Sequence, residues 1–446
     1  MTRSRLPGPT SVGERVALLR DLARNPHDAL RSMRERYGPV VELGRGRFRY
    51  VYLLSPEANE HILATDPANF TWKEAFRPLE VVNGPTSLTL SDGDDHRRRR
   101  RIVQPAFHRR RIAGYLDIMI AETDRVLDGW RPGEVVDASA LFRLAVRRIV
   151  LRSLFGHRLA DRDDELANHL EITLAYVDRP PARRFDHDLP GLPYRRALKA
   201  RHAADRLVYA EIGRRRHEDG SDDVLGWLLE EANRGDLTDQ EVRDQVISLV
   251  AAGYHTTASA MGWIVDHLAR EPELMEAIGG EHATVVGSGP LRPEHLPRLI
   301  HAGALVSEIL RHHPPAIWSG RRSVADFELH RQPIPAGSMI LFSPHVTHHL
   351  ADQFPEPDTL KPGRWIDGHP DQHLHHPYAY IPFGGGSRRC LGFAFALQEL
   401  TVMTTLLAAR TSIRPVDPIP PHPAGTTSNA PAGGVPVTVT SVLPSR

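Results

Sequence analysis

A single cysteine near the C-terminal end of the chain carries the most specific chemistry in this sequence. Cys390 is the only cysteine among 446 residues, so it cannot form an internal disulfide or a multi-cysteine metal cage. It lies in the stretch Phe383-Gly384-Gly385-Gly386-Ser387-Arg388-Arg389-Cys390-Leu391-Gly392, and an apolar run typical of a helix follows. Cations and a helix N-terminus stabilise a thiolate, and glycines let the backbone approach a flat cofactor. Such a site suits thiolate ligation of haem iron.

The same ten residues resemble the haem-binding signature of the cytochrome P-450 family, F-x-x-G-x-R-x-C-x-G, and match it at every defined position. A buried structural cysteine after a glycine turn is the alternative, and the spacing favours the haem ligand. The resemblance implies that Cys390 is the axial ligand of haem b (iron protoporphyrin IX). It also implies that Phe383, Gly384, Arg388 and Gly392 contact this cofactor.

A second stretch, Ala252-Gly253-Tyr254-His255-Thr256-Thr257, lies inside a long predicted helix. Glycine inside a helix costs about 0.5–1 kcal/mol relative to alanine, and threonines can bond back to the preceding turn, so we expect a local bulge with a groove beside it. The stretch resembles the family's oxygen-binding motif A-G-x-D/E-T-T/S. This implies that Ala252 contacts the cofactor, that Gly253, His255 and Thr256 serve catalysis, and that Thr256 assists proton delivery. His255 replaces the family's usual carboxylate, so either it relays protons itself or the relay runs through water and Thr256.

Basic residues elsewhere offer bonds to the carboxylates of a cofactor. His96 and Arg100 share one face of a predicted helix, at i and i+4, and resemble the family's H-x-x-x-R pair that bonds a haem propionate. The other arginines of the run from His96 to Arg101 are expected in solvent. Arg321 matches the position that reaches another propionate, although Arg322 could take its place, and a guanidinium suits a carboxylate. The run alone would indicate nucleic-acid binding, but the formal net charge of +1 and the absence of interleaved aromatic residues predict no nucleic-acid partner.

A third group of charges resembles a structural feature of the family. Glu308 and Arg311 are spaced i and i+3, and Pro362-Gly363-Arg364-Trp365 supplies a second arginine. They resemble the motifs E-x-x-R and P-x-R-W, which implies a buried charge cluster of Glu308, Arg311 and Arg364 near the haem-binding loop. The 25 histidines lack the spacing of a zinc site, so we expect no metal other than haem iron.

The elements that must position these residues are mainly helical. A capping box at Thr238 and Glu241 opens a helix that could run to Arg270, and further helical patterning covers residues 16–24, 29–37, 95–177 and 194–217. Short strands are expected at residues 40–43, 49–54, 322–342 and 435–442, whereas residues 70–90 indicate a long loop. The pattern predicts an α-rich α+β protein. The resemblance implies the cytochrome P-450 fold, a helical bundle that encloses haem, together with small β-sheets.

The whole chain, residues 1–446, is expected to form one domain. Its parts would be a β-containing N-terminal part to about residue 90, a helical haem-enclosing part over about 91–412 and a β-containing tail over about 413–446. With 41% hydrophobic and 25% charged residues the composition is that of a globular protein. No run approaches the roughly 20 apolar residues of a membrane span. We therefore expect a monomeric cytoplasmic protein without a membrane anchor.

The resemblance implies a monooxygenase that inserts one oxygen atom from O2 into a small molecule. The electrons would come from a ferredoxin and a ferredoxin reductase on separate chains, which Arg388, Arg389 and the arginines near residue 98 could dock. The alternatives are a peroxide-using peroxygenase, a class that usually lacks the threonine, and a non-catalytic haem protein with His255 as a distal ligand.

The substrate pocket is expected to be apolar and to take a lipophilic terpenoid, steroid or fatty-acid-like molecule. By family position it should also draw on residues 179–193 and 426–429. The residues expected to line it are Trp72, Phe76, Val81, Val82, Leu88, Ala316, Ile317 and Trp318.

Overall fold

The computed structural model describes residues 6–44, 46, 49–179, 184, 187–216, 223–366, 375–425 and 428–445. The chain forms two compact units. The first unit holds residues 1–77, 308–390 and 425–429, and the second holds residues 78–307, 391–424 and 430–446. The single domain with parts that meet near residues 90 and 412 stays a prediction.

The predicted N-terminal hairpin opens a five-stranded sheet in the first unit. Strands β1 (Val40–Leu43) and β2 (Tyr50–Leu53) pair antiparallel, and β2 pairs parallel with β8 (Met339–Phe342). Antiparallel pairing then adds β5 (Ser319–Ser323) and β3 (Phe70–Thr71) at the far edge. The strands expected at residues 40–43, 49–54 and 322–342 are thus confirmed. Strands from distant parts of the sequence pair in this sheet. Their pairing fixes β5, the strand that contains Arg321, along both of its edges.

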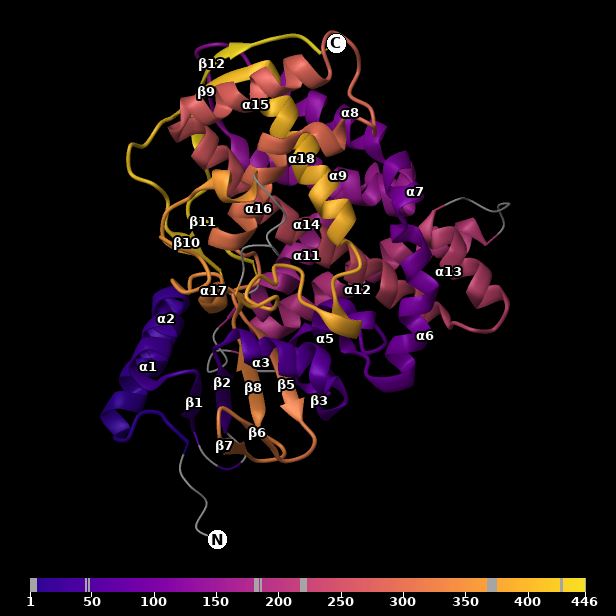
Figure 1. Cartoon of the computed structure of the whole chain (residues 1–446). Coiled ribbons are helices and arrows are strands. Elements are labelled where there is room, and N and C mark those ends of the chain that lie inside the picture. Colours follow the sequence, from indigo (N-terminus) through magenta and orange to yellow (C-terminus); the bar gives the residue numbers. More distant parts are fainter. Residues whose placement is uncertain are drawn as a thin grey trace. The chain divides into compact units, whose positions relative to one another are not determined.

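Helices cover this sheet within the first unit, as Figure 1 shows for α2 beside β1. Ser11 caps the first helix with a capping box that includes Glu14, which satisfies N–H groups that the helix itself leaves free. Buried aliphatic residues on the strands, such as Val51 and Ile340, form one core cluster with Phe70. The remaining elements of the unit are α1 (Val12–Arg24), α2 (Pro26–Tyr37), α3 (Pro56–Glu60), α4 (Lys73–Phe76), β6 (Phe327–Leu329), β7 (Gln332–Ile334), α17 (Pro344–Thr347) and the end of α16 (Ile300–His312).

The segment from residue 70 to residue 90 differs from the expected long loop. It contains short helical pieces, among them α4 and α5 (Glu80–Asn83), and the strand β3. Each piece has only two to four residues, too few to show a helical or strand period in the sequence.

The second unit is mainly helical and is built around α14 (Asp239–Arg270). The capping box at its start is confirmed, since Thr238 accepts a hydrogen bond from the Glu241 N–H and the Glu241 carboxylate accepts one from the Thr238 N–H. Helix α9 packs along it. The other helices of the unit are α6 (Gly93–Val103), α7 (Arg109–Gly114), α8 (Leu116–Asp128), α9 (Ala138–Phe155), α10 (His157–Ala160), α11 (Asp163–Val177), α12 (Pro193–Arg215), α13 (Val224–Asn233), α15 (Pro272–Val285) and α18 (Phe393–Arg410).

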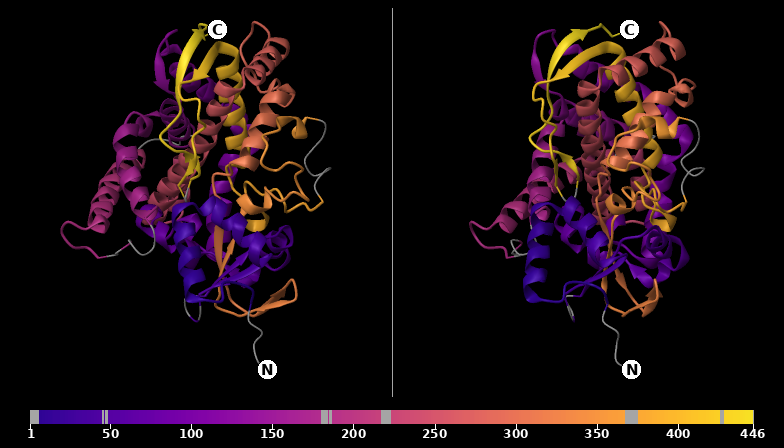
Figure 2. Two further views of the ribbon diagram at one scale, coloured as in Figure 1. Left: turned by 90° about the vertical axis from the view of Figure 1, so that its left-hand side faces the viewer. Right: turned by 60° about the vertical axis from the view of Figure 1, so that its left-hand side comes forward.

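Two small sheets complete the second unit. Strand β12 (Pro436–Val442) pairs antiparallel with β4 (Val135–Asp137) and β9 (Thr411–Pro415), and β10 (Pro423–Ala424) pairs with β11 (Ala430–Pro431). The β9–β12 pair can be followed in yellow in both views of Figure 2. The C-terminal strand is confirmed, and so is the α-rich class with small sheets. In the described part of the chain, no helix has both the length and the apolar character of a membrane span.

Candidate active site

The loop around Cys390 is closed on itself and leaves the thiol exposed. The Cys390 N–H donates to the Phe383 carbonyl at 2.9 Å, and the Cys390 side chain lies at the surface of the described chain. Gly384 and Gly386 have φ values of 66° and 57°, in the left-handed region that favours glycine. A Cβ atom on Gly386 would lie 1.9 Å from the Leu63 carbonyl oxygen. The glycines are therefore required by backbone geometry, and they leave one face of the loop open beside the sulfur.

The helix after this loop begins where the sequence predicts. Helix α18 starts at Phe393, with Gly392 as its N-cap. Cys390 is thus three residues from the first helical residue, a position where the helix dipole favours a negative charge.

Two of the predicted cofactor-binding arginines meet at one indole ring. The guanidinium carbon of Arg321 lies 3.7 Å from the centroid of the Trp72 ring, and that of Arg388 lies 5.2 Å from the same centroid. Arg322 is engaged elsewhere, in an ion pair with Glu74 and a hydrogen bond to the Gly337 carbonyl. The Arg321 guanidinium also donates to the Ser319 hydroxyl and the Gly320 carbonyl, so its place beside Arg388 at the Trp72 ring, and not a lack of partners, distinguishes it from Arg322. The arrangement also makes Trp72, expected in the substrate pocket, a partner of both guanidinium groups.

Helix α6 presents His96 and Arg100 one turn apart, with His96 buried and Arg100 half-buried. The expectation that the rest of this basic run lies in solvent is wrong for Arg98 and Arg99, which both bond Glu241. Burial would raise the pKa of Glu241, but the Thr238 N–H and the two arginines lower it to about 2. Because these arginines already neutralise a carboxylate, the run does not present a continuous cationic strip to a nucleic acid.

Helix α14 is continuous through the glycine and the threonines, so the predicted bulge is wrong. The Thr256 hydroxyl donates to the Ala252 carbonyl at 2.8 Å, the bond to the residue four positions earlier that threonines form in helices. A Cβ atom on Gly253 would lie 3.2 Å from the side chain of Val150 on α9, so this glycine is explained by close helix packing. Ala252 is exposed although Ala251 is buried, which leaves an open patch on α14 next to Thr256.

His255 lies beside the Tyr254 ring, with 4.1 Å between the ring centroids. Burial, and then the charge of Arg143, lower the pKa of His255 to about 4. The imidazole is therefore neutral near pH 7. It lacks the second ring proton that it would need in order to act as an acid in place of the usual carboxyl group.

Glu308, Arg311 and Arg364 come together in the first unit, as their spacing suggested. Arg311 forms a two-pronged bond to Glu308 at 2.9 and 2.8 Å, and the Arg364 Nε donates to the same carboxylate at 3.1 Å. Two further donors bond this carboxylate that the spacing of the charges did not indicate, the Trp365 indole N–H at 2.7 Å and the Lys361 backbone N–H at 2.8 Å. Burial would raise the pKa of Glu308, but Arg311 and these donors lower it. The Trp365 donor could have been predicted from the sequence, because Trp365 adjoins Arg364 in the P-x-R-W motif.

The residues expected to line the substrate pocket have different surroundings. Trp72 and Phe76 stack with 4.5 Å between their ring centroids. Ile317 is completely buried in a core cluster with Leu30 and Val346, and Ala316 beside it is exposed. Trp318 packs at the edge of that cluster, Val81 and Val82 are buried on α5, and Leu88 is half-buried. Residues 180–183, 185, 186, 426 and 427 of the expected pocket segments lie outside the described residues.

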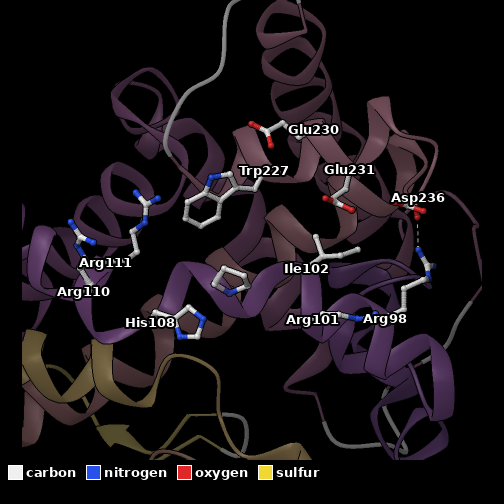
Figure 3. A pocket seen from close by; sticks show the side chains of 11 residues that line it. Arg98, Arg101, Ile102, His108, Arg110, Arg111, Trp227, Glu230, Glu231 and Asp236 are labelled. Carbon is white, nitrogen blue, oxygen red and sulfur yellow. Dashed lines mark hydrogen bonds between the residues drawn. The ribbon is translucent and has the colours of Figure 1, made fainter.

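A cavity of about 770 Å³ lies elsewhere in the second unit and contains none of the expected pocket residues. It opens between α6, α7 and α13, with Trp227 facing the cationic wall in Figure 3. The guanidinium of Arg111 stands 4.9 Å from the centroid of the Trp227 ring. The polar residues around it are Arg98, Arg101, His108, Arg110, Arg111, Glu230, Glu231 and Asp236. Its lining is therefore polar, unlike the apolar lining expected of the substrate pocket.

Comparison with known proteins decides the family. The model of the family Cytochrome P-450 matches residues 7–428. The chain belongs to the cytochrome P-450 family. Among its relatives is Putative cytochrome P-450 139 of Mycobacterium tuberculosis (strain H37Rv), 37% identical over 395 residues that cover 87% of this chain and 91% of the relative. The Cyclooctat-9-en-7-ol 5-monooxygenase of Streptomyces melanosporofaciens is 31% identical over 404 residues, which cover 89% of this chain and 86% of the relative.

A solved structure has the same fold as this cytochrome P-450. The retinoic-acid-bound cyanobacterial CYP120A1 superposes with a TM-score of 0.88 over 99% of this chain and 100% of the other, at 23% identity. The cytochrome P-450 fold is therefore confirmed. As a member of this family the protein is a haem-binding monooxygenase, which excludes the non-catalytic alternative.

The residues of this cytochrome P-450 fit a haem. The donor set contains one thiol, held exposed by a glycine loop that a Cβ atom at Gly386 would fill. The Arg321–Arg388 pair in the first unit and the His96–Arg100 face in the second unit supply cationic groups that suit propionate carboxylates. The open patch at Ala252 adds an apolar surface.

Neutralising Glu308 should destabilise the cytochrome P-450 strongly. In Glu308→Gln the buried Arg311 loses its counter-charge, and breaking a buried pair from one side costs about 3–5 kcal/mol. Urea unfolding of the holoenzyme measures this free energy. Lys361→Met is the matched control, because the Lys361 ammonium only pairs with the exposed Glu356, and it should change the free energy of unfolding little. Equal stability of Glu308→Gln and the wild type would contradict the interpretation.

Proposed function

We propose that this cytochrome P-450 inserts one oxygen atom from O2 into a lipophilic small molecule of the terpenoid class, with Cys390 as the haem ligand. The observation that supports it most is the exposed thiol of the only cysteine, held by the Cys390-to-Phe383 bond in a loop whose glycines are sterically required. When bound, haem supplies an iron centre at which O2 is activated. Substrates such as steroids and fatty acids share the lipophilic character and form the wider class.

Each proposed haem contact has a separate task. Cys390 Sγ would bind the iron as a thiolate, Phe383, Gly384 and Gly392 would shape the loop on either side of it, and Ala252 would offer the open patch on α14. Arg321 and Arg388 would bind a propionate, and His96 and Arg100 would likewise bind a propionate. Trp72 keeps Arg321 and Arg388 oriented, because both guanidinium groups lie over its ring.

Proton delivery is assigned to the Thr256 hydroxyl. Its hydrogen is directed to the Ala252 carbonyl, so its oxygen is free to accept a hydrogen bond from a water molecule and to pass a proton on by rotation. His255 is neutral near pH 7 because its pKa is about 4. We therefore favour the relay through water and Thr256 over a relay through His255, with Gly253 serving the packing of α14.

The substrate class is supported by the relatives. The Streptomyces melanosporofaciens protein is named for an oxygenation of cyclooctat-9-en-7-ol, and CYP120A1 was solved with retinoic acid bound. Both names denote molecules that are mostly hydrocarbon, in agreement with the apolar residues expected around Phe76, Val82 and Leu88.

The electron donor is proposed to be an acidic ferredoxin, reduced by its own reductase on a separate chain. The cavity in Figure 3 supplies a docking surface for it. Arg101, His108 and Arg110 are exposed on its rim. The wall they belong to adjoins α18, because the Gln398 side chain donates to the Ile112 carbonyl at 2.9 Å. A partner bound there would lie against the helix that follows Cys390. Arg389 is exposed in the loop of residues 381–390 that ends at Cys390, here called the thiolate loop.

Binding and turnover should identify the substrate class. Adding terpenoids to the ferric holoenzyme should shift the iron from low to high spin, which absorbance records, whereas macrolides should not. With ferredoxin, reductase and isotopically labelled O2, the same terpenoids should gain one labelled oxygen atom. Turnover with hydrogen peroxide but none with ferredoxin would instead support the peroxygenase alternative. A Cys390→Ser variant that keeps the thiolate spectrum would disprove the ligand assignment.

Removing the Thr256 hydroxyl should separate electron use from product formation. Thr256→Ala should lower the yield of product per reducing equivalent by about tenfold or more, a typical size for loss of a general acid–base group, while hydrogen peroxide release rises. His255→Gln is the matched control on the same helix turn and should keep the yield within about twofold. A larger loss in His255→Gln than in Thr256→Ala would transfer the relay to the histidine.

Charge reversal should slow electron transfer from the ferredoxin. Arg101→Glu, Arg110→Glu and Arg389→Glu should each lower the second-order rate of reduction by about tenfold at low salt, because electrostatic steering raises association rates by roughly 10 to 1,000 times. The difference should shrink at high salt. Arg414→Glu on β9, also exposed, serves as the control. Unchanged rates and salt dependence in all three variants would rule out this docking surface.

A further inference from the structure

His348 joins two parts of the first unit through both of its ring nitrogens. It follows α17 and is completely buried. Its Nε2 accepts a hydrogen bond from the Ile381 N–H at 2.9 Å, and its Nδ1 lies 3.2 Å from the Arg311 carbonyl oxygen. A backbone N–H can only donate and a carbonyl can only accept. The ring must therefore be the neutral tautomer with its hydrogen on Nδ1.

Ile381 is the entry point of the thiolate loop. Its carbonyl accepts a hydrogen bond from the Gly384 N–H at 3.0 Å, and the Phe383 carbonyl two residues on accepts the Cys390 N–H at 2.9 Å. The path from His348 to the cysteine therefore consists of successive backbone bonds within one loop. Whatever holds the Ile381 N–H fixes the near end of this loop.

The groups around His348 oppose a positive charge on its ring. Burial is the largest cause that lowers the pKa of His348, followed by the charges of His349 and Arg311, whereas the carbonyls of Arg311 and Leu310 act in the opposite direction. His349 is itself part of a row of imidazoles, with ring centroids 4.5 Å from His345 and 5.3 Å from His312. His27 continues the row, 5.1 Å from His345.

The fixed charges near this row are already paired. Arg31 of α2 binds Asp358, and Arg311 of α16 binds Glu308. The centroid of the Tyr380 ring lies 5.2 Å from that of the His348 ring, and neither His348 nitrogen contacts a carboxylate in its hydrogen bonds to Ile381 and Arg311. A proton added to the row therefore meets the charges of Arg311 and of the other imidazoles first.

We propose that His348 is a positioning residue for the thiolate loop: its neutral ring clamps Ile381 to the end of α16, and protonation at Nε2 releases the loop. The release follows from geometry, since an N–H on Nε2 would face the Ile381 N–H and two donors cannot bond each other. The inference rests on the proposed role of Cys390 only for its effect on the haem. The clamp itself is a property of the protein chain.

The clamp gives the loop a defined response to pH. The ring binds a proton more weakly when the loop is closed than when it is open and solvated, where its pKa returns to about 6.5. The closed state is therefore fully favoured above pH 6.5 and loses stability as the pH falls below it. Each pH unit below that value increases the open fraction by up to about tenfold until the pKa of the closed state is reached.

Hydrogen exchange of the Ile381 amide in the holoenzyme tests the clamp directly. In His348→Leu this amide should exchange about tenfold faster than in the wild type, which corresponds to the net contribution of about one hydrogen bond. His348→Gln supplies an amide oxygen that can accept the same N–H but does not titrate. It should keep the protection near pH 7 and abolish the loss of protection between pH 6.5 and pH 5, where protection is the ratio of the intrinsic to the measured exchange rate at each pH. His348→Gln also keeps the test valid if the leucine variant fails to fold.

The matched control is His349→Gln, a neighbouring buried histidine whose Nδ1 bonds the His345 carbonyl and not the loop. It should leave the protection of the Ile381 amide at pH 7, and the loss of that protection in acid, largely unchanged. An equal effect in His349→Gln and His348→Gln would mean that acid acts by protonating the buried histidine row as a whole and not through the bond between His348 and Ile381. That result, or unchanged Ile381 exchange in His348→Leu, would overturn the proposal.

The absorbance of the carbon monoxide complex gives a second readout that separates the two hypotheses. If the clamp positions Cys390, the thiolate band should be lost at a higher pH in the wild type than in His348→Gln. If the Ile381 amide responds as expected but Cys390→Ser leaves the thiolate band in place, the clamp stands and the ligand assignment fails.

Discussion

One ion pair without access to water sets the arrangement of the first unit. Arg311 has five N–H donors, and all five are used: two on Glu308 and three on backbone carbonyls. The carboxylate of Glu308 also accepts hydrogen bonds from the Lys361 N–H and from the side chains of Arg364 and Trp365. A buried pair of charges is tolerated only when its hydrogen-bonding capacity is met in this way. The end of α16 is thereby tied to the segment that leads into the thiolate loop, through the residues His348, Pro357, Thr359, Lys361, Arg364 and Trp365.

The same principle organises part of the second unit. Arg243, which is buried, binds Asp205 and Asp244, and Asp244 in turn accepts the Thr86 N–H at 2.9 Å. Glu241, one turn earlier on α14, receives Arg98 and Arg99 from α6. The start of the long helix is therefore held to its neighbours by charges, whereas its middle is held by close apolar packing, as at Gly253 against Val150. The open patch at Ala252 lies in that apolar part.

Local patterns predicted the elements well, because their causes lie within a few residues. The capping box of α14 needs only Thr238 and Glu241, and the thiolate loop and the start of α18 follow from the ten residues around Cys390. The charge cluster was partly visible for the same reason, since Glu308 and Arg311 are one turn apart. The predicted substrate and redox-partner details have no such local cause, so they remain predictions.

The errors concern contacts between residues that are distant in sequence. Nothing near Arg99 in the sequence shows that Glu241 will accept its guanidinium. The His348-to-Ile381 bond was missed for this reason too, because a lone histidine among 25 gives no sign of its partner. The bulge expected in α14 is wrong for a different reason. The Thr256 hydroxyl bonds the Ala252 carbonyl within a regular helix, so this bond does not interrupt the helix.

The contact between Gly386 and the Leu63 carbonyl determines which parts of the thiolate loop are open to redesign. No side chain fits at Gly386 without moving the backbone of residue 63, and its positive φ adds a conformational penalty for any other residue. Ser387 and Arg389 beside it are exposed, so their side chains can vary without entering this seam. A directed-evolution library of this loop should therefore keep Gly386 and vary residues 387 and 389. Substitutions at 386 would mostly give misfolded protein, whereas substitutions at 387 and 389 would test changes in function.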